Sequence, residues 1–225
     1  MKKWISLAAL TFLINTGHGQ YIAYKKLSAS LGTTGLGGEF SQALNERFDL
    51  AGEISYLTAP FKFNATLAFQ SVTVEPMLST FQAGVRLDLY PFTRYVGSRD
   101  TRIPIKLSAG VYVRSSGDYK GRATMKGQYY IGQFALEPED LGYVDVIIKT
   151  NSFLPYAGAG FDFKIARQWG MGMDMGIFYH GKPEVEMTGT GVLNSNEENA
   201  DQLESNLQTY TWFPNLRIKL NYRIH

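Results

Sequence analysis

Several segments of the chain alternate strictly between apolar residues and polar or small ones, and this period of two constrains the fold more than any other feature. The alternation is clearest in residues 105–114, and it returns in residues 170–180 and 216–224. A period of two places successive side chains on opposite faces of a β-strand. Each segment also has about the 9–11 residues that a tilted strand needs to cross a membrane. The sequence therefore predicts an all-β protein whose strands have one apolar and one polar face.

Composition favours a membrane barrel over a soluble β-sandwich, which could also alternate. The chain contains 23 glycines, 14 tyrosines and 14 phenylalanines. Outside its N-terminus it has no long apolar run, which excludes a helical membrane protein, whereas only alternate residues of a barrel strand face lipid. Aromatic residues gather at the ends of the alternating segments, in residues 90–92, 153–156, 178–179 and 210–213. This placement is typical of the aromatic girdles at the two membrane interfaces.

The first twenty residues predict a secretory signal peptide. Lys2 and Lys3 form a basic start, residues 4–14 form an apolar run, and small residues follow in alternate positions, at 17 and 19. The apolar run is too short for a membrane-spanning helix, which disfavours the alternative of a retained anchor. We expect cleavage after Gly19, so that residues 1–19 are removed and residues 20–225 form a single outer-membrane β-barrel domain. The chain has no cysteine, which excludes an acylated lipoprotein and a disulfide-stabilised scaffold.

The expected fold is a transmembrane antiparallel up-and-down β-barrel of about eight strands. Across residues 32–35 the apolar residues change from odd to even positions, which either a bulge or a tight hairpin turn would cause. Single-chain bacterial barrels have an even number of strands, so the hairpin is favoured and residues 21–31 and 35–44 are taken as two strands. Ten strands are the alternative, because residues 62–74 and 143–150 could extend strands or add hairpins above the membrane.

The connections between these strands differ in length, as expected for an outer-membrane barrel with short periplasmic turns and long outer loops. The predicted turns are residues 44–47, 92–103 and 166–168, and the predicted extracellular loops are residues 58–76, 115–152 and 181–209. Within the last loop, residues 194–208 are polar but carry two leucines four residues apart, Leu203 and Leu207. This segment is interpreted as either a short surface helix or a disordered stretch.

The strand faces predicted to point into the barrel carry charges of both signs. An isolated buried charge is very costly, so opposite charges in a narrow barrel must pair or meet water. An eight-stranded barrel is just wide enough for side chains to fill it, and a polar core held by ion pairs is expected. The residues of this predicted network are Glu39, Asp49, Glu53, Arg86, Asp88, Lys106, Arg114, Asp162, Lys164, Asp174, Arg217, Lys219 and Arg223.

His180 ends an alternating segment near the predicted outer rim, which raises the hypothesis of a lipid-modifying enzyme. Asp174 lies six residues earlier, roughly 20 Å along a strand, which is too far to orient the histidine. No Gly-x-Ser-x-Gly motif is present, so a structural histidine is favoured and no catalytic residue is predicted. With three histidines and no cysteine, no metal site or cofactor is predicted. The scattered charges also give no support for nucleic-acid binding.

Five stretches together resemble the small outer-membrane β-barrel proteins of Gram-negative bacteria. They are LGTTGLGGEF, LDLYPF, LSAGVYVRSSG, LPYAGAGFDF and WGMGMDMGIFYHGKPEVEMTGTG. The resemblance extends over nearly the whole mature chain, and it implies the barrel architecture and a cell outer-membrane location. Because its motifs are patterns of glycine and aromatic residues, it implies no particular activity. Many such barrels end in phenylalanine, whereas this chain ends in His225.

Three functions of different classes are compatible with these features. A structural or surface-interaction barrel, with long outer loops and a filled lumen, is favoured. A small channel or a barrel that binds an apolar solute would need a less filled lumen. A lipid-modifying enzyme would need a serine or carboxylate that converges on His180. The expected partners are outer-membrane lipid and the barrel-assembly machinery during insertion, with no nucleic acid and with an unidentified extracellular ligand.

Overall fold

The computed structural model describes most of the predicted mature chain. The described residues are 24–60, 62–67, 70–92, 105–115, 118–126, 129–131, 133–137, 141–191, 193 and 199–224. The predicted signal peptide and its cleavage site lie outside these residues, as does most of the predicted turn 92–103. Among the residues that the structure describes, no helix is long and apolar enough to cross a membrane.

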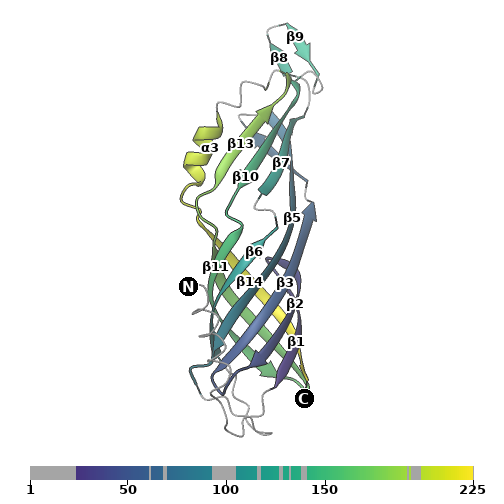
Figure 1. Cartoon of the computed structure of the whole chain (residues 1–225). Coiled ribbons are helices and arrows are strands. Elements are labelled where there is room, and N and C mark those ends of the chain that lie inside the picture. Colours follow the sequence, from purple (N-terminus) through teal and green to yellow (C-terminus); the bar gives the residue numbers. More distant parts are fainter. Residues whose placement is uncertain are drawn as a thin grey trace, which may run out of the picture.

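Eight strands hydrogen-bond into a closed antiparallel ring (Figure 1). They are β1 (Lys25–Gly32), β2 (Gly35–Ala43), β3 (Phe48–Pro60), β5 (Gln70–Leu89), β6 (Ile105–Arg114), β11 (Phe153–Lys164), β12 (Trp169–Tyr179) and β14 (Trp212–Ile224). Around the ring the order is β5, β3, β2, β1, β14, β12, β11 and β6, and pairing of β6 with β5 closes it. The predicted all-β barrel with eight strands is confirmed.

The outer surface of the ring is apolar, although its side chains are not covered by any other part of the described chain. On adjacent strands Leu31, Leu36 and Ile218 are each more than half exposed. Aromatic pairs lie near both ends of the ring, with ring centroids 5.0 Å apart for Trp169 and Tyr222 and 4.9 Å apart for Tyr179 and Trp212. A continuous apolar surface between two aromatic girdles matches the lipid-facing surface of a membrane barrel.

The change of phase at residues 32–35 is a hairpin turn, as predicted, rather than a bulge. Gly32 pairs with Gly35, so only Thr33 and Thr34 connect β1 to β2. Gly35 has a φ of +89°, a conformation that residues with a side chain rarely adopt. A side chain there would also clash with the carbonyl oxygen of Tyr56 on β3. Gly35 therefore sets the boundary between the first two strands.

One wall of the barrel continues beyond the ring as a sheet. β5 is 20 residues long, and its first part pairs with β4 (Phe63–Leu67) and with β7 (Asp118–Met125). β7 pairs with β10 (Tyr143–Lys149), which pairs with β13 (Glu184–Gly189). We call β5, β7, β10 and β13 above the ring the sheet extension; it stands at the upper end in Figure 1. A separate hairpin is formed by β8 (Tyr129–Ile131) and β9 (Phe134–Leu136).

Three predicted outer loops are therefore partly wrong, because they contain strands of this extension. The alternative that residues 62–74 and 143–150 extend the barrel above the membrane describes the structure better. In the third predicted loop, α3 (Ala200–Leu207) forms a helix, where disorder was the competing interpretation. The side chain of Glu204 on α3 accepts a hydrogen bond from the Val185 N–H at the outer edge of β13 (3.0 Å). The helix thus covers an edge that would otherwise leave backbone groups unpaired.

The two faces of the wall exchange polarity where the ring ends. Within the ring the inner face is polar and the outer face apolar, but in the sheet extension the face continuous with the lumen is apolar. This inner face consists of Val72, Val74, Pro76 and Leu78 of β5, Tyr119, Ala123 and Met125 of β7, Val144, Val146 and Ile148 of β10, and Val185 and Met187 of β13. The opposite face carries charged pairs such as Arg122 and Asp145. The reversal marks the level at which the wall leaves an apolar environment and enters water.

Candidate functional site in the barrel interior

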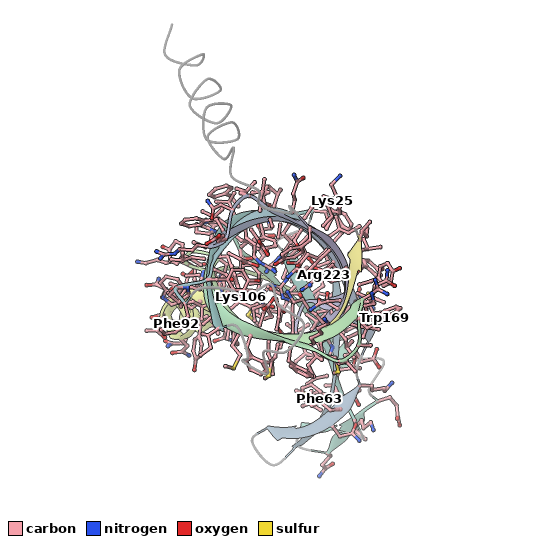
Figure 2. The ribbon with its side chains drawn as sticks, turned by 90° about the horizontal axis from the view of Figure 1, so that it is seen from below. Lys25, Phe63, Phe92, Lys106, Trp169 and Arg223 are labelled. Atoms are coloured by element: carbon pink, nitrogen blue, oxygen red, sulfur yellow. The ribbon has the colours of Figure 1, made fainter. Side chains whose placement is uncertain are left out.

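Side chains fill the inside of the ring (Figure 2). In this end-on view Lys106 lies inside the ring, whereas Lys25 and Trp169 lie outside it. The alternation of the strands produces this division, because every second side chain points inward. Arg86, Lys106, Arg217 and Lys219 are each at most 1 % exposed. Such burial of charged residues requires partners nearby.

Arg86 on β5 is the centre of the interior network. Its guanidinium contacts Glu39 on β2 at 2.7 Å, Glu53 on β3 at 2.9 Å and Asp88 on its own strand at 2.8 Å. It also lies 3.4 Å from Asp174 on β12. Because these carboxylates come from four strands around the ring, the interactions of one arginine connect opposite walls of the barrel.

A second group of cations closes the network from the other side. Lys106 on β6 contacts Asp174 at 2.8 Å and Asp88 at 3.3 Å. Lys219 on β14 contacts Asp174 at 2.9 Å and Glu39 at 3.3 Å. Arg217, also on β14, pairs with Glu53. Each carboxylate that Arg86 binds therefore has at least one further cationic partner.

The lower part of the interior contains a smaller cluster around Asp162. Lys26 on β1 contacts Asp162 at 3.1 Å and Asp49 at 3.8 Å. The hydroxyl of Tyr90 donates a hydrogen bond to Asp162 at 3.1 Å. Lys26 is absent from the network predicted from the sequence. In the alternation of β1, Leu27 faces outward and its neighbour Lys26 therefore faces inward. The period of two in that strand would have been sufficient to place Lys26 in the interior.

Three residues of the predicted network behave differently from the rest. Lys164 is exposed at the lower end of β11 and makes no ion pair with any described residue. The guanidinium of Arg223 lies 4.6 Å from the ring centroid of Tyr24. Arg114 is buried but has no carboxylate partner in the described part of the chain.

A layer of aromatic and aliphatic side chains lies above the ion pairs. Tyr112, Leu154, Tyr156 and Phe178 are all at most 4 % exposed and pack together from β6, β11 and β12. The hydroxyl of Tyr112 also donates a hydrogen bond to Glu53 at 2.9 Å, which joins this layer to the network below. The layer closes the interior toward the sheet extension.

Glycines on neighbouring strands make room for the large rings of this layer. A side chain at Gly84 would overlap the ring of Tyr112, and one at Gly158 or Gly176 would overlap the ring of Tyr156. The rings of Tyr112 and Tyr156 therefore occupy space that these glycines leave open.

His180 follows β12 at the upper end of the ring. Its Nδ1 atom is buried and has no hydrogen-bond partner in the described residues. Burial, followed by the nearby charge of Arg114, lowers the pKa of His180. Asp174, the acidic residue nearest to it on the same strand face, is bound by lysines and arginines of the network instead. In the described residues no group of three or more acidic, histidine or cysteine residues could hold a metal ion.

No protein-family model matches the chain. No curated protein matches its sequence either.

Solved structures nevertheless match its shape. CarO of Acinetobacter baumannii has a TM-score of 0.61 and 19 % identity, with 91 % of this chain and 99 % of that one covered. CarO2 of the same organism has a TM-score of 0.59 and 18 % identity, with coverage of 92 % and 100 %. A major outer membrane protein from Thermus thermophilus has a TM-score of 0.52 and 9 % identity, with coverage of 91 % and 100 %. The chain has the fold of an outer-membrane β-barrel protein.

Proposed function

We propose that the protein is a closed outer-membrane barrel whose task lies at the cell surface. In this proposal the ring anchors the chain in lipid, the interior does not conduct, and the sheet extension projects outward to meet other molecules. The observation that carries the proposal is the burial of Arg86, whose guanidinium contacts carboxylates from four strands. A solute could pass only if these contacts were broken.

The energetics of the interior support a closed barrel over a small channel. Removing one partner of a buried ion pair costs about 3–5 kcal/mol, because the other charge is left uncompensated. Opening a path through the ring would disturb several such pairs at once. It would also displace the layer formed by Tyr112, Leu154, Tyr156 and Phe178. A stable open state is therefore not expected from this set of side chains.

The outer face of the sheet extension supports a position in water beyond the membrane. Arg122 makes two hydrogen bonds to Asp145, at 2.7 and 2.8 Å, and its guanidinium lies 3.9 Å from the ring centroid of Tyr143. The hydrogen bonds from Arg122 lower the pKa of Asp145. Lys149 pairs with Glu186 on the next strand. A surface of this kind is suited to an aqueous environment and to contacts with other molecules.

The ring would have two kinds of partner. Outer-membrane lipid would cover its apolar exterior, and insertion would use the barrel-assembly machinery. β14 supports the proposed use of the barrel-assembly machinery. It alternates between apolar outward residues and polar or charged inward ones over most of its length.

Ion conductance across a planar lipid bilayer tests the proposal. The purified, folded protein is added to a bilayer of phosphatidylcholine in concentrated potassium chloride, and an open porin serves as the positive control for insertion. We expect no discrete conductance steps. Insertion is verified independently by recovery of the protein with vesicles of the same lipid. Reproducible unitary steps from the inserted protein would overturn the closed-barrel proposal and favour the channel.

A further inference from the structure

Arg114 is a buried arginine whose charge no described carboxylate balances. It is the last residue of β6 and is 3 % exposed. Its Nη1 donates a hydrogen bond to the Tyr119 hydroxyl at 2.7 Å and lies 3.5 Å from the Thr150 hydroxyl. The guanidinium also lies 5.9 Å from the ring centroid of Phe213. Its Nε atom is buried and has no partner among the described residues.

The other buried cations of the ring differ from Arg114 in this respect. Lys26, Arg86, Lys106, Arg217 and Lys219 each contact at least one carboxylate. An uncompensated buried charge destabilises a protein, and a bound anion would remove that penalty. Among the described residues, Arg114 is thus the buried cation of the barrel to which the protein itself supplies no counter-charge.

His180 is near enough to Arg114 for the charge of the guanidinium to contribute to lowering the pKa of the imidazole, and it also has an unpaired polar atom. It is 8 % exposed, and its Nδ1 is buried without a partner in the described chain. A neutral imidazole can donate a hydrogen bond through one ring nitrogen. Two buried polar atoms, one on β6 and one after β12, therefore lie at the upper end of the ring without a partner among the described residues.

The backbone is irregular at this same level. Arg114 of β6 pairs with Gln82 and Lys120 of β7 pairs with Met77, so the chain has one residue more between these two positions than the β5 segment opposite them. Gly181, next to His180, has a φ of +75°. The shift of register brings Tyr119, at an odd position, to the same side of the wall as Arg114, at an even position.

The apolar inner face of the sheet extension begins at Arg114. Tyr119, which hydrogen-bonds Arg114, belongs to that face, and it pairs with Ile148, which pairs with Val185. From Tyr119 to Met125 the face runs along β7 for six residues, which is roughly 20 Å at the usual rise of a strand. An apolar track therefore leads away from a buried positive charge.

We propose that the protein binds the anion of a free single-chain fatty acid at this place. The carboxylate pairs with Arg114 and accepts a hydrogen bond from His180, and the alkyl chain lies along the inner face of the sheet extension. The charge of the head matches the unpaired guanidinium, and the apolar tail matches the face above it. A fatty-acid carboxylate is proposed because its single negative charge balances the single positive charge of Arg114.

Photo-crosslinking tests this proposal. The folded protein in phosphatidylcholine nanodiscs is titrated with dodecanoate that carries a diazirine near the end of its tail, and labelled peptides are identified by mass spectrometry. We expect saturable labelling of β7, β10 or β13. Unlabelled dodecanoate should compete for this labelling, whereas dodecyltrimethylammonium, which has a cationic head, should not. Equal competition by the two amphiphiles, or labelling confined to the lipid-facing strands of the ring, would overturn the proposal.

Variants of Arg114 test the role of the charge. Arg114→Gln should raise the concentration of labelled dodecanoate that gives half-saturation about tenfold or more, since a charge-assisted contact is lost. Arg114→Lys should restore part of the binding. Arg122→Gln is the matched control, because Arg122 lies on the opposite face of the same sheet, and it should label like the unchanged protein. Each variant must first show a heat-modifiable folded band. Unchanged labelling in folded Arg114→Gln would overturn the proposal, and the competition experiment decides the question if that variant fails to fold.

The outcome is separable from that of the closed-barrel proposal, because the site lies above the interior network. If the protein conducts ions but is still labelled saturably by the dodecanoate probe, the closed-barrel proposal alone is overturned. A barrel that does not conduct and does not label would overturn the fatty-acid site alone.

Discussion

Replacing Arg86 by methionine should strongly destabilise the folded barrel. Methionine keeps much of the length of the side chain but removes the charge that four carboxylates share. Each of those carboxylates retains another cation, namely Lys219, Arg217 or Lys106. The four carboxylates would then share these three cations, so one negative charge is left uncompensated. We therefore expect a loss in the usual range for a broken buried pair, about 3–5 kcal/mol of unfolding free energy.

The assay is equilibrium unfolding in urea with the protein in lipid vesicles, followed by tryptophan fluorescence. Arg122→Met is the matched control, because it removes the same group from an ion pair that is half exposed on the sheet extension. Exposed pairs contribute little to stability, so this variant should unfold close to the midpoint of the unchanged protein. The reasoning would be refuted if Arg86→Met lost no more stability than Arg122→Met, since the interior network would then not hold the ring together.

Three further predictions concern single positions. Gly35→Ala should cost about 1–3 kcal/mol because of its positive φ, whereas Gly38→Ala, where a methyl group meets only ordinary contact, should change little; equal urea midpoints would contradict this. Tyr112→Phe should cost about 1.5–3 kcal/mol, the loss of a hydrogen bond to a buried carboxylate, and an unchanged midpoint would argue against that bond. With Trp169 or Trp212 as the single tryptophan, lipids brominated near the head groups should quench fluorescence more than lipids brominated at the tail ends; the reverse order would place the girdles wrongly.

The ring could be predicted because, within its strands, apolar and polar residues alternate without interruption. Residues 105–114 and 216–224 alternate without interruption, and their pairing in the structure follows that alternation. The hairpin at Gly35 was predictable because bacterial barrels have an even strand number. The same periodicity is sufficient to place Arg86 and its carboxylate partners on the inward face.

The sheet extension escaped prediction because two local signals change at the end of the ring. Between Arg114 of β6 and Lys120 of β7 the chain has one residue more than the β5 segment opposite it, which shifts the phase of the alternation. The polarity of the two faces also reverses, so the outward positions there include charged residues such as Arg122 and Asp145 instead of a regular apolar series. Lys164 was assigned to the interior from its phase alone, but it lies beyond the last pair between β11 and β6, at the end of the strand, where the side chain reaches water.

The central claim is that this chain forms a closed barrel that resides in a membrane, and heat-modifiability tests it most directly. The mature protein is refolded in detergent and run on a gel with and without boiling, and circular dichroism is recorded on the same sample. We expect the unboiled sample to migrate faster than the boiled one and to show a β-rich spectrum. An identical migration of both samples, together with solubility in plain buffer, would contradict the membrane barrel.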